Sequence, residues 1–223
     1  MNRLSMAKRL AMEATRGAGP LTTINQVYEV GRFVTWIDSA YEDIQIRSAV
    51  WQFLRFSFSF HTTAGKRNYN KVEMGVPDMA SWIPDSFKFY MTSTGVNGEM
   101  WLEYWPWQDF YYTYEFGANQ AIQGPPKYFT IKPDKTISYW PTPDGDYTIS
   151  SEYYRRPFVM TADDDEPVFD PHHHMIIVWQ ALMFYAADAA APEKYAAGQK
   201  EFNKKLQKLE LDELPEWFIA TSL

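Results

Sequence analysis

Two consecutive helices with uncovered apolar faces are predicted near the end of the chain, and they constrain the fold more than any other stretch. Asp170 is the expected N-cap of the first helix and Pro171 its first residue, where a proline loses no hydrogen bond. Pro192 ends that helix and opens the second. Apolar residues recur at intervals of three and four, which puts them on one face of each helix: Met175, Val178, Trp179, Leu182, Met183 and Ala186, then Tyr195, Phe202, Leu206 and Leu209.

A helix far upstream is the expected partner of this pair. Thr22 or Thr23 is its expected cap, and the helix is predicted to continue through Trp51, a length of about 25 to 30 residues. Its apolar residues again alternate steps of three and four: Val27, Val30, Val34, Ile37, Tyr41 and Ile44. We therefore expect residues 21–53 to pack with residues 159–209 as one helical domain.

Directly after the upstream helix, the apolar period changes from 3.6 to 2, which is typical of a strand. Phenylalanines alternate with polar residues over residues 54–61. A turn at 64–66 is predicted to return the chain along 68–72, so that the two segments form a hairpin. The phenylalanine face of this hairpin needs to be buried.

Further strands are predicted downstream. Residues 86–92 and 99–105 flank the turn sequence Gly95-Val96-Asn97-Gly98 and should form a second hairpin. Residues 127–132, 136–140 and 146–156 are separated by turn residues and should form a three-stranded meander. Residues 105–116 are compatible with either a helix or a loop. The predicted fold class is α+β, with residues 54–158 as a β-rich insertion in the helical domain.

The two ends of the chain are predicted to lie outside these domains. Residues 1–20 form a basic N-terminal arm, with a short helix over 3–16 whose apolar side is thin: Leu4, Ala7, Leu10, Ala11 and Ala14. Such a short helix is marginal in isolation and should fray unless a partner covers it. Residues 210–223 form a C-terminal tail without periodicity, in which Trp217, Phe218 and Ile219 make an apolar cluster.

The composition excludes several classes of protein. The 223-residue chain contains no cysteine, which excludes disulfides and cysteine-ligated zinc and fits a reducing cytoplasm. A net charge of −7 argues against broad nonspecific binding to nucleic-acid phosphates. No apolar run is long enough to span a membrane. Aromatic residues make up 17% of the chain, which is more than one soluble core ordinarily uses, so part of them is expected at interfaces.

Two stretches invite a metal interpretation, and both fail on spacing. His172, His173 and His174 are adjacent, so on a helix their side chains point about 100° apart and cannot converge on one ion. The acidic run 163–166 lacks the alternating oxygen spacing and the glycine of an EF-hand loop. We interpret this run as a solvated segment that favours the start of the following helix. No metal or other cofactor is expected.

The aromatic stretch 101–116 offers two alternative functions. The carboxylates Glu99, Glu103 and Asp109 lie among these rings, as the acid pair of a glycoside hydrolase would. Without hydrolysis, Trp101, Trp105 and Trp107 could stack on a carbohydrate. We prefer the interpretation that the rings fill the β core and contact neighbouring subunits. Phosphate-loop, dinucleotide and nucleophile-elbow motifs are all absent from the sequence, so no catalytic residue is assigned.

The order and spacing of several segments resemble the head-to-tail adaptor (connector) proteins of tailed bacteriophages. The resemblance covers about residues 22–215, and the acidic segment 163–167 that leads into a histidine-initiated, alanine-rich helix completes it. Its segments are Val34-Thr35-Trp36-Ile37-Asp38-Ser39-Ala40-Tyr41-Glu42-Asp43-Ile44-Gln45, Trp51-Gln52-Phe53-Leu54, Thr62-Thr63-Ala64-Gly65 with Tyr69, Gly124-Pro125-Pro126-Lys127-Tyr128-Phe129, Tyr139-Trp140-Pro141-Thr142-Pro143-Asp144 and Tyr153-Tyr154-Arg155-Arg156-Pro157.

This resemblance implies a structural protein of the virion, made in the host cytoplasm. Members look like helical bundles with a β insertion that assemble as a ring of twelve beneath the dodecameric portal. The ring extends the DNA channel and presents a platform for the next tail component. By analogy, Trp217, Phe218 and Ile219 would dock on the portal, and the net negative charge would let DNA pass without binding. We expect the free protein to be a monomer that assembles on the portal.

Overall fold

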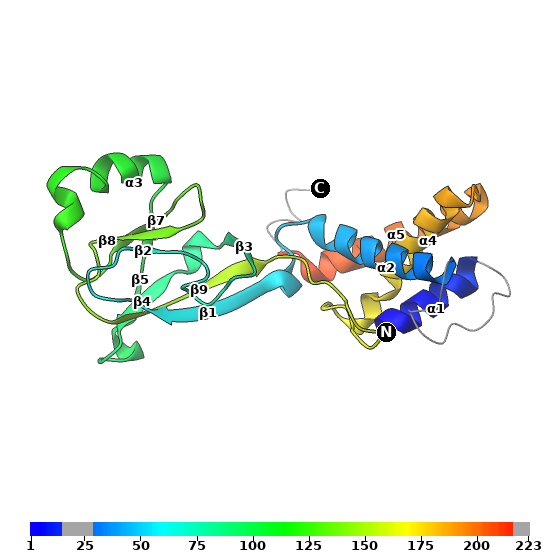
Figure 1. Ribbon diagram of the computed structural model, residues 1–223, viewed down its shortest axis with the longest axis horizontal. Coiled ribbons are helices and arrows are strands. Elements are labelled where there is room, and N and C mark those ends of the chain that lie inside the picture. The colour runs from blue at the N-terminus through cyan, green and yellow to red at the C-terminus, as the bar shows by residue number, and fades with distance from the viewer. Residues whose placement is uncertain (15–28, 216–223) are drawn as a thin grey trace. The chain divides into compact units, whose positions relative to one another are not determined.

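The structure is a computed structural model that describes residues 1–14 and 29–215 (Figure 1). The chain divides into two compact units. The helical unit comprises Met1–Leu54 and Pro157–Leu223, and the β unit comprises Arg55–Arg156. Helices at both ends of the sequence and strands between them confirm the predicted α+β class. In the described ranges, no helix is both long and apolar enough to cross a membrane.

The helical unit is built around α4 (Met175–Asp188), which contacts α1 (Arg3–Ala14), α2 (Glu29–Ile46) and α5 (Pro192–Glu213). Because α4 has neighbours on several sides, it is buried around most of its circumference. Its buried apolar residues are Ile176, Ile177, Val178, Ala181, Leu182 and Ala186. The prediction of one apolar face was therefore too narrow, and Met175, Trp179 and Met183 are only half-buried.

The upstream helix is shorter at its C-terminal end than predicted. Val34, Ile37, Tyr41 and Ile44 are buried, which confirms the apolar face over the described part of the helix. The prediction that the helix continues through Trp51 was wrong, because α2 ends at Ile46. The buried Trp51 ring instead folds back, and its Nε1 donates to the carbonyl of Ile44 at 3.1 Å. That bond satisfies a carbonyl of the last turn and so favours the helix end there.

Asp170 is a cap with Pro171 after it, as predicted, but the α-helix itself begins later, because α4 starts at Met175 and its N-cap is His174. The Asp170 side chain accepts a hydrogen bond from the backbone N–H of His172 at 2.8 Å and caps a 3-10 turn, η5 (Pro171–His173), that leads into α4. In α5, Phe202 and Leu209 are buried as predicted, whereas Tyr195 is exposed. Helix α5 continues to Glu213, so the predicted tail loses its first four residues to the helix.

The segment set apart as an N-terminal arm is packed in the helical unit over its described residues. Helix α1 buries Met6, Ala7, Leu10, Ala11 and Ala14 and contacts α4 and α2. The first turn of α1 is hydrogen-bonded to the backbone of the acidic run 163–166. The N–H groups of Arg3 and Leu4 donate to the carbonyls of Asp165 and Asp163 at 2.8 and 3.1 Å. The Arg3 guanidinium binds Asp38 of α2 through two bonds of 2.9 and 2.5 Å. Partner helices thus supply the cover that a short helix needs.

The β unit consists of two sheets. The first has the order β1 (Arg55–His61), β9 (Tyr147–Arg155), β4 (Lys88–Met91), β5 (Met100–Trp101), and β3 (Met79–Trp82) also pairs with β9. The second has the order β2 (Asn68–Tyr69), β8 (Ile137–Trp140), β7 (Tyr128–Ile131), β6 (Glu103–Tyr104). Two 3-10 turns, η2 (Pro84–Ser86) and η3 (Val96–Gly98), lie between strands of the first sheet, and α3 (Trp107–Tyr114) and a third turn, η4 (Gly117–Ala121), lie between β6 and β7 of the second.

Aromatic residues dominate the core of the β unit. Phe60 of β1 packs on Tyr69 of β2 with ring centroids 5.1 Å apart, and Phe87 packs on Phe129 of β7 at 4.3 Å. Nine of the fifteen buried core residues are aromatic: Phe60, Tyr69, Trp82, Phe87, Phe89, Phe129, Tyr139, Tyr147 and Tyr153. Much of the high aromatic content therefore lies inside this unit, in residues outside the aromatic stretch 101–116.

Two of the predicted strand pairings are wrong. Residues 54–61 and 68–72 do not form a hairpin, because β1 pairs with β9 over seven residues while β2 pairs with β8 over two. Strand β1 can form more backbone hydrogen bonds with the nine-residue β9 than with the two-residue β2. The expected meander breaks at its third strand, since β7 and β8 pair but β9 joins the other sheet. The pairing of β4 with β5 confirms the second hairpin, although residues 103–104 leave it as β6 and run parallel to β7.

Candidate interaction surfaces

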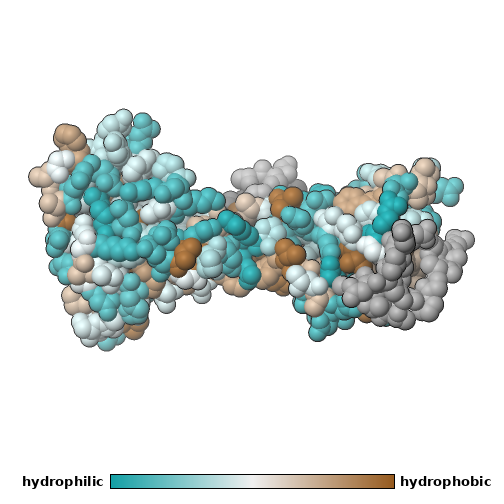
Figure 2. All heavy atoms as spheres, viewed as in Figure 1, coloured by the Kyte–Doolittle hydropathy of each residue, from teal (hydrophilic) through white to brown (hydrophobic). Residues whose placement is uncertain are grey.

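Exposed apolar side chains concentrate in one segment of the β unit. Among the described residues, fifteen large hydrophobic side chains are exposed, and eight of them lie between 96 and 122: Val96, Met100, Trp101, Tyr104, Tyr111, Tyr112, Phe116 and Ile122. On the face of each unit drawn in Figure 2, hydrophobic residues (brown) form small areas separated by hydrophilic ones (teal). Interaction sites are built from exposed apolar side chains, and this segment supplies more of them than the rest of the described chain. We call residues 96–122 the exposed apolar segment.

Helix α3 carries the most exposed part of this segment. It is a helix where the sequence left helix and loop open, and it lies over β7 (Figure 1). Its inner side is fixed by Phe110, which is fully buried, and by Tyr114. Its outer side presents Tyr111 and Tyr112, of which Tyr112 is 70% exposed. A helix with aromatic residues on both sides has more apolar surface than its own unit covers.

A stack of aromatic rings holds the inner side of α3 on the second sheet. Tyr114 stacks on Trp140 of β8 with centroids 4.2 Å apart and on Tyr128 of β7 at 5.6 Å. Trp105 packs edge-on against Tyr114 at 5.3 Å. The Trp140 Nε1 also donates to the carbonyl of Asn119 at 2.9 Å, which ties down the turn after the helix. Within the aromatic stretch, Trp105 and Tyr114 are therefore structural.

A group of three charged residues fixes the end of α3. Glu115 is the C-cap of the helix, and its carboxylate lies 3.5 Å from Arg67 and 3.4 Å from Lys132. Their side chains are 16%, 11% and 21% exposed, respectively, so the group is largely shielded from water. Burial lowers the pKa of the Arg67 guanidinium, and the nearby Glu115 carboxylate opposes that shift. Arg67, Glu115 and Lys132 are far apart in the sequence, so no sequence pattern predicts that they meet.

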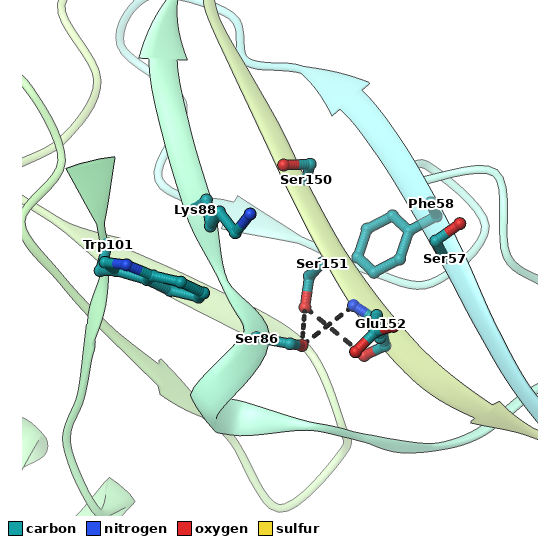
Figure 3. Close-up of a pocket in the computed structure, with 8 residues that line it drawn as sticks. All are labelled: Ser57, Phe58, Ser86, Lys88, Trp101, Ser150, Ser151 and Glu152. Carbon is teal, nitrogen blue, oxygen red and sulfur yellow. Dashed lines mark hydrogen bonds between the residues drawn. The ribbon is translucent and has the colours of Figure 1, made fainter. Parts of the chain in front are cut away.

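The edge strand β5 borders a surface pocket of about 390 Å³ (Figure 3). The ammonium of Lys88 lies 4.8 Å from the centre of the Trp101 ring and 3.4 Å from Glu99. Ser86 and Ser151 hydrogen-bond to each other at 2.8 Å, and Ser86 accepts from the N–H of Glu152 at 3.0 Å. These serines are therefore satisfied within the sheet. Trp101, which is 64% exposed, is the side chain here that is most available to a partner.

The carboxylates considered for a glycoside hydrolase lie on different elements. Glu99 precedes β5, Glu103 is in β6 and accepts from the Nε1 of Trp105 at 3.1 Å, and Asp109 is in the first turn of α3. All three are exposed. A general acid of this mechanism is usually enclosed by apolar groups, and none of these carboxylates is. Of the three candidate sugar-stacking tryptophans, Trp105 and Trp107 are half-buried and only Trp101 is open.

The three adjacent histidines have three separate partners. His172 binds Asp170 at 2.6 Å, His173 lies 3.0 Å from Asp212, and the buried His174 ring donates from Nε2 to the carbonyl of Phe169 at 2.9 Å. Over residues 1–14 and 29–215, no cluster of three or more histidine, cysteine or acidic side chains could hold a metal ion. The other predicted contact residues, Trp217, Phe218 and Ile219, lie outside the described residues.

The chain consists of a helical unit and a β unit, and its exposed apolar segment is a feature of proteins that act by contact with partners. The family model described as SU10 adaptor protein matches residues 1–217. The chain therefore belongs to the SU10 adaptor protein family, a family of phage head-to-tail adaptors, which confirms the resemblance seen in the sequence. Its role is that of a structural head–tail adaptor of the virion. No curated protein matches the chain.

Proposed function

We propose that this protein assembles as a ring of twelve copies beneath the portal, extends the DNA channel and provides the platform on which the tail is attached. The observation that carries this proposal is the exposed apolar segment, which holds more than half of the large exposed hydrophobic side chains described. Membership of the adaptor family supports it. The protein acts by contact, without catalytic turnover, and genomic DNA passes through the ring without specific binding.

The adaptor makes two separate contacts, one with the tail component and one with the portal. The exposed apolar segment contacts the tail component, and Trp217, Phe218 and Ile219 dock on the portal. The second contact is tested by deleting residues 216–223. This deletion keeps the buried Leu214, whereas a longer one would damage the helical unit. We expect the truncated protein to fold and to lose portal binding, and unchanged binding would contradict this role for the tail.

The first contact is tested with the double variant Tyr112→Ser/Phe116→Ser. Both side chains are at least 70% exposed, so the variant should unfold at the same temperature as the parent protein. We expect it to bind the portal normally and to lose attachment of the tail component to adaptor-loaded heads. Val159→Ser, at a site of 77% exposure outside the segment, is the control and should attach tails normally. Normal tail attachment by the double variant would contradict the proposed role.

A further inference from the structure

Three cationic residues line a second surface pocket of the β unit, and the ammonium of one of them, Lys135, donates to the carbonyl of Ala80 at 2.5 Å. Lys71 follows β2, Lys135 lies in the turn between β7 and β8, and Arg156 follows β9. They line a hollow of about 430 Å³ together with Asn70, Val72 and Asp134. We call this hollow the basic pocket. It has a net positive lining in a chain of net charge −7, so it is a local reversal of the surface charge.

The acidic residues around the basic pocket are already engaged. Glu73 binds Lys66 at 2.6 Å, Asp78 binds Arg155 at 2.8 Å, and Asp134 accepts from the N–H and hydroxyl of Thr136 at 2.9 and 3.0 Å. In the part of the chain that the structure describes, no carboxylate forms an ion pair with Lys71, Lys135 or Arg156. The lining carries three cations and one carboxylate, that of Asp134, so its net charge is positive and an anionic partner would be bound favourably.

The shape of the basic pocket favours a peptide loop over nucleic acid. A DNA duplex carries its phosphates on the outside of a wide rod and therefore needs a broad basic surface. A hollow of this size with the apolar Val72, 66% exposed, beside its cations accepts a short acidic loop.

The same chain presents such a loop. Residues 163–166 are its longest run of acidic residues. The Asp165 carboxylate accepts from the N–H groups of Thr161 and Ala162 at 2.6 and 2.8 Å, so the loop is already ordered. Asp164 is exposed, and the Glu166 side chain is 59% exposed and 4.0 Å from the Met1 amino group. An ordered loop loses little conformational entropy on binding.

We propose that the basic pocket of one copy binds the acidic loop 163–166 of the next copy. This inference rests on the proposed function, because it assigns the contact that joins neighbours in the ring. Pocket and loop are different surfaces of one chain, so the contact is head-to-tail. A head-to-tail contact closes a ring when it is repeated around an axis.

The absence of cysteine makes this contact testable by cross-linking. Val72→Cys places a thiol in the pocket without removing a cation, and Asp164→Cys places one on the loop. The two variants are mixed, loaded on the portal and treated with a short bis-maleimide. We expect covalent dimers. Val96→Cys has the same 66% exposure, lies outside the pocket, and should give none with Asp164→Cys.

The protein that carries both substitutions separates contact between copies from contact within one chain. Contact between copies gives a ladder of covalent multimers, whereas cross-linking confined to single chains would overturn the proposal. Charge reversal at Lys71→Glu/Arg156→Glu should lower the yield of dimers roughly tenfold. Lys127→Glu, an exposed lysine elsewhere on the unit, should leave the yield unchanged.

The two proposals fail in different ways. Absence of cross-links while the protein still loads on the portal would overturn the pocket contact and leave the adaptor function standing. Specific cross-links between copies that never load on the portal would keep the contact and overturn the ring beneath the portal.

Discussion

Gly198 of α5 lies against the backbone carbonyl of Trp179 in α4. A Cβ at position 198 would come within 3.2 Å of that oxygen, and equally close to Cγ of Met183. Glycine in the middle of a helix costs stability relative to alanine, so its presence here needs a compensating gain. The gain is the close approach of two helices whose contact is the most extensive in the helical unit.

Substitution Gly198→Val should therefore destabilise the helical unit. The added isopropyl group, a Cβ and two methyl groups, should lower the free energy of unfolding by about 1–3 kcal/mol, since overpacking forces the helices apart. Urea unfolding followed by circular dichroism measures the change. The control is Ala197→Val, which places the same β-branched side chain on the exposed side of the same helix. Equal midpoints for the two variants would show that the helices do not meet at Gly198.

The charged group at the end of α3 gives a second prediction. Glu115→Gln leaves Arg67 and Lys132 shielded from water with no carboxylate, so the β unit should lose about 1–3 kcal/mol of stability. Amide hydrogen exchange in α3 should accelerate, because Glu115 links the helix end to two other segments. Glu103→Gln, at an exposed position, should change neither quantity. Unchanged exchange in α3 after the Glu115 substitution would count against this group as its anchor.

The buried His174 predicts a dependence of stability on pH. Burial lowers the pKa of the His174 imidazole, and its hydrogen bond to Phe169 only partly opposes that shift. An unfolded histidine titrates near pH 6.5, so below that pH the unfolded state binds a proton that the folded state does not. Stability should therefore fall as the pH is lowered from about 6.5 toward the pKa of His174 in the folded protein. Above about pH 6.5, His174 should cause no change in stability.

Thermal unfolding at a series of pH values tests this prediction. His174→Asn should be less stable than the parent protein and should show a weaker fall below about pH 6.5. His172→Gln, in which an exposed neighbour is replaced, should keep the full fall. If His174→Asn retains the same slope, other groups cause the pH dependence.

Arg3 gives a prediction for α1. Its guanidinium binds Asp38 of α2 and also donates to the carbonyl of Thr161 at 2.8 Å. Arg3→Ala should increase amide exchange throughout α1 by about tenfold, because a 12-residue helix is marginal without tertiary contacts. Arg9→Ala removes only an exposed pair with Glu13 within the helix and should have a much smaller effect. Similar exchange in both variants would contradict the role of Arg3.

The helices were largely predictable because their patterns are local. Val34, Ile37, Tyr41 and Ile44 follow the spacing of one buried face, and all four are buried. Strand pairing was not predictable in the same way, because β1 and β9 are joined across 85 residues of sequence. Nothing local shows that residues 54–61 prefer a distant nine-residue strand to the nearer residues 68–72. The turn residues indicated where each strand ends, but they did not indicate which strands pair with each other.

The interaction surface was partly predictable. The aromatic stretch 101–116 marked the right region, and the structure divides it between Tyr114, which is buried against Trp140, and Tyr112, which is exposed. That division depends on which side of α3 meets the sheet, and a stretch aromatic on both sides does not indicate it. The basic pocket gave no sequence signal, since Lys71, Lys135 and Arg156 come together only through the two sheets.

The most direct test of the account is sedimentation of the purified protein alone and with the portal protein encoded in the same genome. We expect the protein to sediment as a monomer when alone, and to move onto the portal until the two are present at one adaptor subunit per portal subunit. Failure to associate with the portal at any concentration, by a protein that remains folded, would contradict the central claim that this chain is the adaptor between head and tail.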